Sequence, residues 1–411
     1  MPLKPFAAIA AALALFGMAA APAGSAEFTD AAGRRLLLPD RINRVMTAEH
    51  TADVLVVVLA PEKLIGWSVP AHGAYLPPRV ARLPVTGRLS GPRPTAGPEA
   101  ILRNHPDIVI DSGPVSRQRI AFADQMQAAT GVPYILVDES IERIPAMLRA
   151  IGMVLGVEDR ASDLAIYAQN AIASVRGRLL IQPTDKRPTV YFGEDTDGLL
   201  TALPGSPDGE VIDQTGALNV ARSIGRGTDA RIPPAQLLAW NPEIIVAAYP
   251  QFYDALHHSR LWRPLAAVRS NKVCLMPRDP FGWIDEAPGV NRIIGLVWLS
   301  GVFYSGPSQE DVRSSLREFY DKFYGAKLTD QQVEALVGRA CVPPANQLQS
   351  VNLPLLGAPP SPGPGSPGMV PLPGVAPDAN TPGLPEAAPG AAPGVPPPGR
   401  RGRAVPPAQL Q

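Results

Sequence analysis

The longest regular pattern of apolar and polar positions lies in the middle of the chain, from about Glu158 to Ile181. Apolar residues recur there every three or four positions, which is the period of an amphipathic helix. Since no proline lies inside the segment and its first glycine is Gly177, it predicts one continuous helix of roughly 30 Å. The apolar positions are Leu164, Tyr167, Ala171, Ile172, Val175 and Leu179.

The chain repeats a second pattern on either side of this helix, at Pro98–Ile110 and at Pro234–Val246. Each copy reads as a short helix, a turn containing proline, an acidic residue and a buried strand. Further strands and helices alternate around both copies, which is typical of α/β units with a parallel sheet. The sequence therefore predicts two Rossmann-like α/β lobes with largely parallel sheets, joined by a single long interlobe helix.

The apolar segment from Thr51 to Ala60 is ambiguous, because its β-branched residues favour a strand. Thr51 and Asp53 offer a helix cap, however, and Pro61 offers a stop. Another strand is expected directly afterwards, at Leu64–Val69. We therefore predict a helix at Thr51–Ala60.

Both ends of the chain differ from the predicted lobes in composition. Residues 1–26 carry Lys4, an apolar run and small residues, which indicates a cleavable signal peptide and export to the periplasm. Residues 344–411 are rich in proline, glycine and alanine and have few large apolar side chains, so they predict a disordered tail. Between the ends, the predicted parts are an N-terminal lobe (27–156), the interlobe helix (157–184) and a C-terminal lobe (185–343).

Charge and cysteine content add little about partners. The 37 basic and 37 acidic residues balance, so net charge gives no reason to expect nucleic acid as a partner. The two cysteines, Cys274 and Cys341, could form a disulfide in an exported chain or remain as two buried thiols. Their number and spacing do not match a metal site.

Catalytic motifs are missing from the sequence. It contains no G-x-S-x-G elbow, H-E-x-x-H pair, phosphate-binding loop or G-x-G-x-x-G turn after a strand. Its five histidines are scattered and predict neither a metal site nor a bound cofactor. An exported α/β hydrolase would need a nucleophile beside a base at a strand end, and no such pair is found. We therefore expect a binding protein and not an enzyme.

Aromatic and arginine residues end or follow several predicted strands. In open parallel sheets, ligands bind beyond the carboxyl ends of the strands, and an arginine there can fork onto a carboxylate, hydroxamate or oxyanion. Asp285 and Arg292 are expected to pair with each other and not with the ligand. The candidate ligand-binding residues are Trp67, Tyr75 and Arg88 in the first lobe and Tyr191, Tyr249 and Trp283 in the second.

The order and spacing of these features resemble the substrate-binding proteins of ABC importers for iron–siderophore complexes, haem and cobalamin. The segments that carry the resemblance are Phe28–Arg34, Pro98–Ile110, the interlobe helix, Trp240–Val246 and Trp283–Trp298. The resemblance implies a monomer that binds its ligand between the lobes and delivers it to the importer's permease.

The same resemblance implies one exposed glutamate on each lobe for docking to arginines of the permease. Glu99 matches this position in the first lobe, and Gln236, an amide, falls on it in the second. As ligand we expect a ferric chelate, because arginine with aromatic residues suits a bulky anionic complex. Haem, cobalamin, and molybdate or tungstate are the alternatives, and a scaffold role of the tail is another. A single connecting helix further implies that the lobes close only slightly on the ligand.

Overall fold

The computed structural model describes residues 26–342, apart from 72, 286–287 and 305–308. The predicted tail and all but the last residue of the predicted signal peptide lie outside this range. No helix in the described part of the chain is long and apolar enough to cross a membrane.

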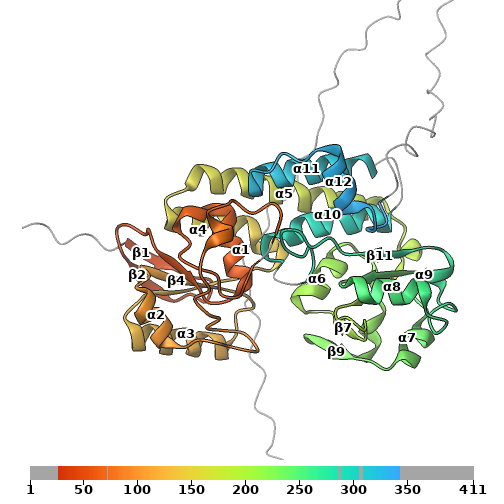
Figure 1. Ribbon diagram of the computed structural model, residues 1–411, viewed down its shortest axis with the longest axis horizontal. Helices are drawn as coiled ribbons and strands as arrows, with labels where there is room; N and C mark the ends of the chain where they lie inside the picture. The colour runs from red at the N-terminus through yellow and green to blue at the C-terminus, as the bar shows by residue number, and fades with distance from the viewer. Residues whose placement is uncertain (1–25, 72, 286–287, 305–308, 343–411) are drawn as a thin grey trace, which may run out of the picture. The chain divides into compact units, whose positions relative to one another are not determined.

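The first lobe is built on a three-stranded parallel sheet in the order β3-β4-β5. Its side chains alternate between two cores: one face packs against α1 and α4, the other against α2 and α3 (Figure 1). The elements are the hairpin β1 (Ala26–Thr29) and β2 (Arg35–Leu38), β3 (Val45–Thr47), α1 (His50–Leu59), α2 (Pro98–Asn104), β4 (Ile108–Ser112), α3 (Arg117–Thr130), β5 (Tyr134–Val137) and α4 (Ile144–Leu155).

The segment after β3 is helical, as predicted, but the helix begins before the expected cap residues Thr51 and Asp53. Glu49 is the N-cap of α1 and accepts a hydrogen bond from the backbone N of Thr51. The strand expected at Leu64–Val69 does not form. Only isolated bridges occur there, between Leu64 and Val45 and between Trp67 and Val85.

The second lobe contains a mixed sheet. Strands β11, β10, β6 and β8 pair in parallel. β7 pairs antiparallel with β6, and β9 pairs antiparallel with β7, at positions where the sequence predicted no strand. The elements are β6 (Thr189–Gly193), β7 (Leu200–Ala202), α6 (Pro207–Gln214), β8 (Leu218–Asn219), β9 (Asp229–Arg231), α7 (Pro234–Trp240), β10 (Ile244–Ala247), α8 (Pro250–His258), α9 (Ala266–Arg269) and β11 (Val273–Leu275).

Helix α5 (Glu158–Ile181) follows the first lobe and has the predicted bounds. Its apolar face is buried at Leu164, Tyr167, Ile172 and Val175 and packs with α4 and with α10 (Arg292–Phe303). The helices α11 (Gln309–Tyr324) and α12 (Asp330–Val337) follow α10. One hydrophobic core includes α5 together with strand residues of both lobes, such as Ile110 and Phe192.

The two cysteines form a disulfide, which resolves the alternative left open by the sequence. Cys274 on β11 and Cys341 after α12 have Cα atoms 5.1 Å apart. The bond ties the last described segment to the second sheet.

The repeated sequence pattern forms the same local structure twice. Helices α2 and α7 both end on a residue in the left-handed conformation, His105 with φ 45° and Asn241 with φ 45°. The acidic residue that follows then caps the start of a neighbouring strand. Asp107 accepts the backbone N of Arg44 at 2.8 Å, and Glu243 accepts the backbone N of Thr189 at 2.8 Å.

Candidate functional site

A cavity of about 830 Å³, here called the cleft, is lined by residues of both lobes. Most of its polar lining follows the carboxyl end of a strand, where ligands bind in parallel sheets. From the first lobe these residues are Glu49 and His50 after β3, Ser112 and Gly113 at the end of β4, and Glu139 after β5. The second lobe contributes Asp208 at the start of α6, Arg278 after β11, and Asp285.

Arg88 is the one predicted ligand-binding residue that lines the cleft among those the structure describes. Its Nε is buried and has no hydrogen-bond partner within the described chain. A Cβ on Gly91 would lie 3.7 Å from a carboxylate oxygen of Glu49 and 3.8 Å from Cδ of Arg88. Arg88 and Glu49 therefore flank Gly91 on the first-lobe wall.

Three other predicted residues, Trp67, Tyr191 and Trp283, lie in the protein interior and not on the cleft wall. Each aromatic ring packs in a core, and its polar atom is satisfied there. Trp67 donates to the carbonyl of Val80 at 2.9 Å, and Tyr191 donates to that of Gly198 at 2.6 Å. The indole of Trp283 donates to Tyr320 Oη at 3.4 Å. The sequence analysis predicted that these three aromatic residues lie beyond strand ends, on the cleft wall. In the structure their apolar surface is buried in the core instead.

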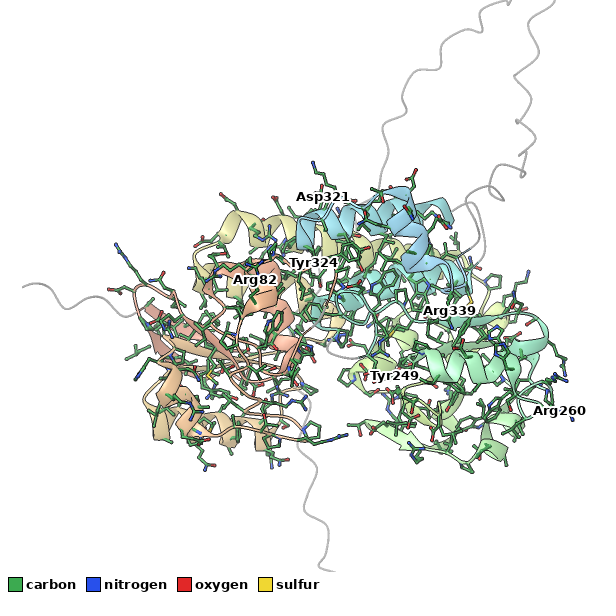
Figure 2. All side chains as sticks on the ribbon, viewed as in Figure 1. Arg82, Tyr249, Arg260, Asp321, Tyr324 and Arg339 are labelled. Atoms are coloured by element: carbon green, nitrogen blue, oxygen red, sulfur yellow. A yellow bond between two sulfur atoms is a disulfide. The ribbon has the colours of Figure 1, made fainter. Side chains whose placement is uncertain are left out.

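The remaining two predicted residues lie outside the cleft wall, and one of them contacts a residue that lines it. Tyr75 packs edge-on against Tyr320, with ring centroids 5.2 Å apart. Tyr249, labelled in Figure 2, precedes α8, and the guanidinium of Arg278 lies 4.1 Å from the centre of its ring. Because Arg278 lines the cleft, Tyr249 holds a cleft cation by a cation–π contact.

A buried carboxylate, Asp111, organises the first-lobe wall. It accepts hydrogen bonds from Ser90 Oγ at 2.8 Å, from Tyr134 Oη at 3.0 Å and from Arg119 Nε at 3.2 Å. Burial alone would lower the pKa of Arg119, but Asp111 beside it raises that pKa above its usual value. Arg119 is thus a fixed cation on the cleft wall whose charge is largely balanced by Asp111.

Two carboxyl groups of the cleft lining have raised pKa values. Burial raises the pKa of Glu49 to about 7, the charge of Glu139 adds to the rise, and a hydrogen bond from Thr51 opposes it. Burial, followed by the charge of Asp285, raises the pKa of Asp208 well above its usual value. Asp208 also hydrogen-bonds to Glu194, so this pair shares a proton.

Arg292, at the start of α10, does not pair with Asp285 as the sequence led us to expect. Its buried guanidinium donates to Glu210 Oε2 at 3.2 Å, to the carbonyl of Pro207 at 3.1 Å and to the carbonyl of Glu139. Glu210 in turn accepts the backbone N of Ile141 at 3.1 Å. The loop after β5 and the start of α6, which bear cleft residues from different lobes, are therefore fixed around one cation.

Sequence reasoning missed most of the charged cleft lining: Glu49, His50, Arg119, Glu139, Asp208 and Arg278. Three of them could have been predicted from sequence, because each follows a strand by two or three residues. These are Glu49, Glu139 and Arg278. Asp208 and Arg119 reach the cleft from the first turns of helices, which the sequence gives no means to orient.

The described residues hold no group of three or more His, Cys, Asp or Glu side chains that could bind a bare metal ion. Any metal in the cleft would have to bring most of its own ligands.

The predicted permease-docking residues lie at the starts of α2 and α7. Glu99 is exposed, and its carboxylate accepts the backbone N of Gly97 at 3.0 Å. Both helices begin with proline and have seven residues, so the position equivalent to Glu99 is Ala235, and Gln236 lies one residue later. One residue turns a helix by about 100°, so Gln236 faces a different direction from Glu99.

Comparison with known proteins gives a consistent result. A family model described as periplasmic binding protein matches residues 48–280. The molybdate-binding protein MolA of Haemophilus influenzae is 23% identical over 327 residues, which cover 72% of this chain and 90% of that protein.

Solved structures agree with the family match. An ABC transporter solute-binding protein from Sulfurospirillum deleyianum is 25% identical, with a TM-score of 0.69 over 75% of this chain and 98% of that one. Molybdate-bound MolA of Haemophilus influenzae has a TM-score of 0.62 at 21% identity, over 74% of this chain and 99% of that one. These relatives are solute-binding proteins and not enzymes. The chain belongs to the periplasmic binding protein family, whose members deliver ligands to the permeases of ABC importers.

Proposed function

We propose that the cleft carries an anionic metal chelate to an ABC importer, with a ferric siderophore complex as the first candidate. The observation that supports this most is the combination of a cavity of about 830 Å³ with arginines on both of its walls, Arg88 and Arg119 facing Arg278.

The size of the cleft favours a bulky ligand. Sites for small organic molecules span roughly 300–1,000 Å³, and the cleft falls in that range. A tetrahedral oxyanion has the bulk of a few waters, on the order of 100 Å³ at about 30 Å³ each. Such an ion would leave most of the cleft to solvent.

The charges favour an anionic ligand with a polar periphery. Asp111 already balances Arg119, whereas Arg88 has a buried Nε that still needs an acceptor. Protonated carboxyl groups, which the raised pKa values of Glu49 and Asp208 favour, can donate hydrogen bonds to oxygen atoms of a chelate.

A second candidate ligand is molybdate or tungstate. The similarity to MolA favours it, since that relative is named for molybdate binding. Arginine suits either anion, so affinity for each has to be measured.

The predicted signal peptide at residues 1–26 supports a location in the periplasm. We propose Glu99 as the first-lobe contact to the permease, because it is exposed on the first turn of α2. Gln236 is the weaker second-lobe candidate, given its offset from the equivalent position.

The ligand proposal can be tested by tryptophan quenching and calorimetry against ferric hydroxamates, ferric catecholates, haem, cobalamin, molybdate and tungstate. We expect tight binding of at least one ferric chelate. Arg88→Gln should weaken it about 10- to 100-fold, since a hydrogen bond to a charged group contributes about 1.5–3 kcal/mol. The matched control is Arg93→Gln, on an exposed arginine of the same loop that does not line the cleft. Tight binding of molybdate alone would overturn the chelate assignment.

A further inference from the structure

A buried carboxylate, Asp53, lies directly behind the first-lobe wall in the first turn of α1. It accepts hydrogen bonds from the hydroxyl of Thr47, from Ser68 Oγ at 2.7 Å and from Ser68 N at 3.1 Å. A fourth contact joins Oδ2 of Asp53 to Nδ1 of His50 at 2.9 Å. His50 is the only one of these partners that lines the cleft.

This contact fixes the chemistry of the imidazole. A carboxylate only accepts hydrogen bonds, so Nδ1 of His50 must carry the proton. In the neutral ring, the lone pair then lies on Nε2. Nothing in the described part of the chain is hydrogen-bonded to Nε2, and the side chain is 19% exposed.

The orientation of the ring is fixed as well. Phe281 packs edge-on against His50 with centroids 5.5 Å apart, and Trp67 does so at 6.2 Å. Since Thr47 and Ser68 already provide Asp53 with three donors, solvation of this carboxylate does not require the histidine. The network therefore holds an imidazole in place on the wall of a ligand cavity.

We infer that His50 coordinates the metal of the cargo through Nε2, with Asp53 as the positioning residue behind it. A carboxylate that holds the second nitrogen of a metal-binding histidine is the usual arrangement at protein metal sites. The inference rests on the proposed function and adds a selection rule to it. The cleft prefers chelates that leave a coordination position of the metal open.

One protein ligand cannot hold a bare ion, and the described residues contain no cluster that could supply the others. The chelator must therefore contribute the remaining ligands, and its anionic groups would face Arg88 and Arg278. The protein would thus discriminate against both free metal and fully wrapped metal.

The test compares two copper(II) complexes on the full-length mature protein. In copper nitrilotriacetate, water occupies the positions that the chelator leaves open, whereas EDTA wraps the ion. Because exposed histidines also bind the open complex, the parent protein carries His105→Gln, His257→Gln and His258→Gln. We expect the open complex to bind at least tenfold more tightly than the wrapped one, and pulsed EPR to show coupling to the remote nitrogen of an imidazole.

His50→Ala should abolish both the preference and the EPR coupling, and added imidazole should restore them by occupying the vacated space. Asp53→Asn should weaken binding of the open complex about 10- to 100-fold, as is typical when the residue behind a metal ligand changes. The matched control is His72→Gln, at the other histidine that remains in the parent protein.

The outcomes separate this inference from the proposed function. If wrapped chelates of copper or iron bind as tightly as open ones and His50→Ala changes neither, the inference is overturned while the chelate function stands. If neither copper complex nor any ferric chelate binds, both are overturned. Loss of the preference in His72→Gln but not in His50→Ala would also overturn the assignment to His50.

Discussion

The two lobes share a backbone device and differ in the side chains placed around it. In both, a seven-residue helix starts with proline, ends in the left-handed conformation and leads to an acidic residue that caps a neighbouring strand. Beyond the strands the similarity ends. β4 leads into the Asp111–Arg119 network, whereas β10 leads through Ala248 to Tyr249.

It follows that the repeated motif positions the strands in both lobes but contributes no side chain to ligand binding. Chemistry lies in the residues just after the strands and in the first turns of the following helices, which differ between the lobes. The same holds at the start of the motif, where the exposed Glu99 of the first lobe has Ala235 as its counterpart in the second.

The largest effect is expected where the two lobes depend on one side chain. Arg292→Met would leave the half-buried Glu210 without its cation, and removing one partner of an ion pair costs up to about 3–5 kcal/mol when the pair is fully buried. Urea unfolding should register most of this loss in the free energy of unfolding.

The double variant Arg292→Met, Glu210→Gln should recover part of that stability, because no half-buried carboxylate is then left without a cation. Arg263→Met, on an exposed arginine, serves as control. A loss below about 1 kcal/mol for Arg292→Met would mean that the lobes do not depend on this pair.

The buried tyrosines of the two sheets give a matched pair. Tyr134 donates to the carboxylate of Asp111 at 3.0 Å, whereas Tyr191 donates to a backbone carbonyl at 2.6 Å. Tyr134→Phe should cost about 1.5–3 kcal/mol and Tyr191→Phe only about 0.5–1.5 kcal/mol, because hydrogen bonds to charged groups are stronger. Thermal and urea unfolding can rank the stability losses of the two variants. Equal losses would contradict the stronger hydrogen bond that we expect between Tyr134 and the carboxylate of Asp111.

Glu194, which hydrogen-bonds to the cleft residue Asp208, predicts a pH dependence of stability. Burial, with Asp208 beside it, raises the pKa of Glu194 to about 10, so the folded state holds a proton that the unfolded state releases near its usual value of 4.5. Stability contributed by this proton is complete below about pH 4.5 and is lost as pH rises towards 10.

Glu194→Gln keeps the hydrogen-bonding shape and removes the titration. It should stabilise the protein by more than about 1 kcal/mol at pH 8, because each pH unit between 4.5 and 8 adds up to about 1.4 kcal/mol, and by little at pH 4. Unfolding curves of the variant and of the exposed control Glu62→Gln across this range provide the measurement. A stabilisation that does not grow with pH would refute the shared proton.

The smallest effects are expected at the two left-handed helix ends. Glycine adopts this conformation without strain, so His105→Gly should stabilise the protein by about 0.5–1 kcal/mol. Asn241→Gly should not, because Oδ1 of Asn241 accepts the backbone N of Ala266 at 2.7 Å and that bond would be lost. Urea titrations of the two variants should show changes in the free energy of unfolding of opposite sign. Changes of equal sign would contradict this difference between the two helix ends.

Much of the fold could be predicted because its signals are local. The period of α5, the proline starts of α2 and α7, and the alternation of strands and helices all lie within short windows. The β7–β9 extension could not be predicted, because its three-residue strands lie in a polar, glycine-rich segment without alternation.

The cleft was less predictable, because a large aromatic residue near a strand end is compatible with either a ligand contact or a core position. Trp67, Tyr191 and Trp283 are large enough to be cleft walls or core residues, and only the tertiary structure decides in favour of the core. Arg88 was found because a guanidinium near a strand end suits an anionic ligand. His50 was missed because its partner Asp53 reads from the sequence as a helix-cap acid.

The hydrophobic core that runs from Ile110 through α5 to Phe192 has a consequence for how such proteins can diverge. Each lobe has a core of its own on one face of its sheet, but the other face of both sheets shares this core. Exchanging one lobe between relatives would therefore mismatch side chains along α5 and α10. New ligand preferences are therefore expected to arise by substitution in the loops around the cleft, while the two halves of the chain are inherited together.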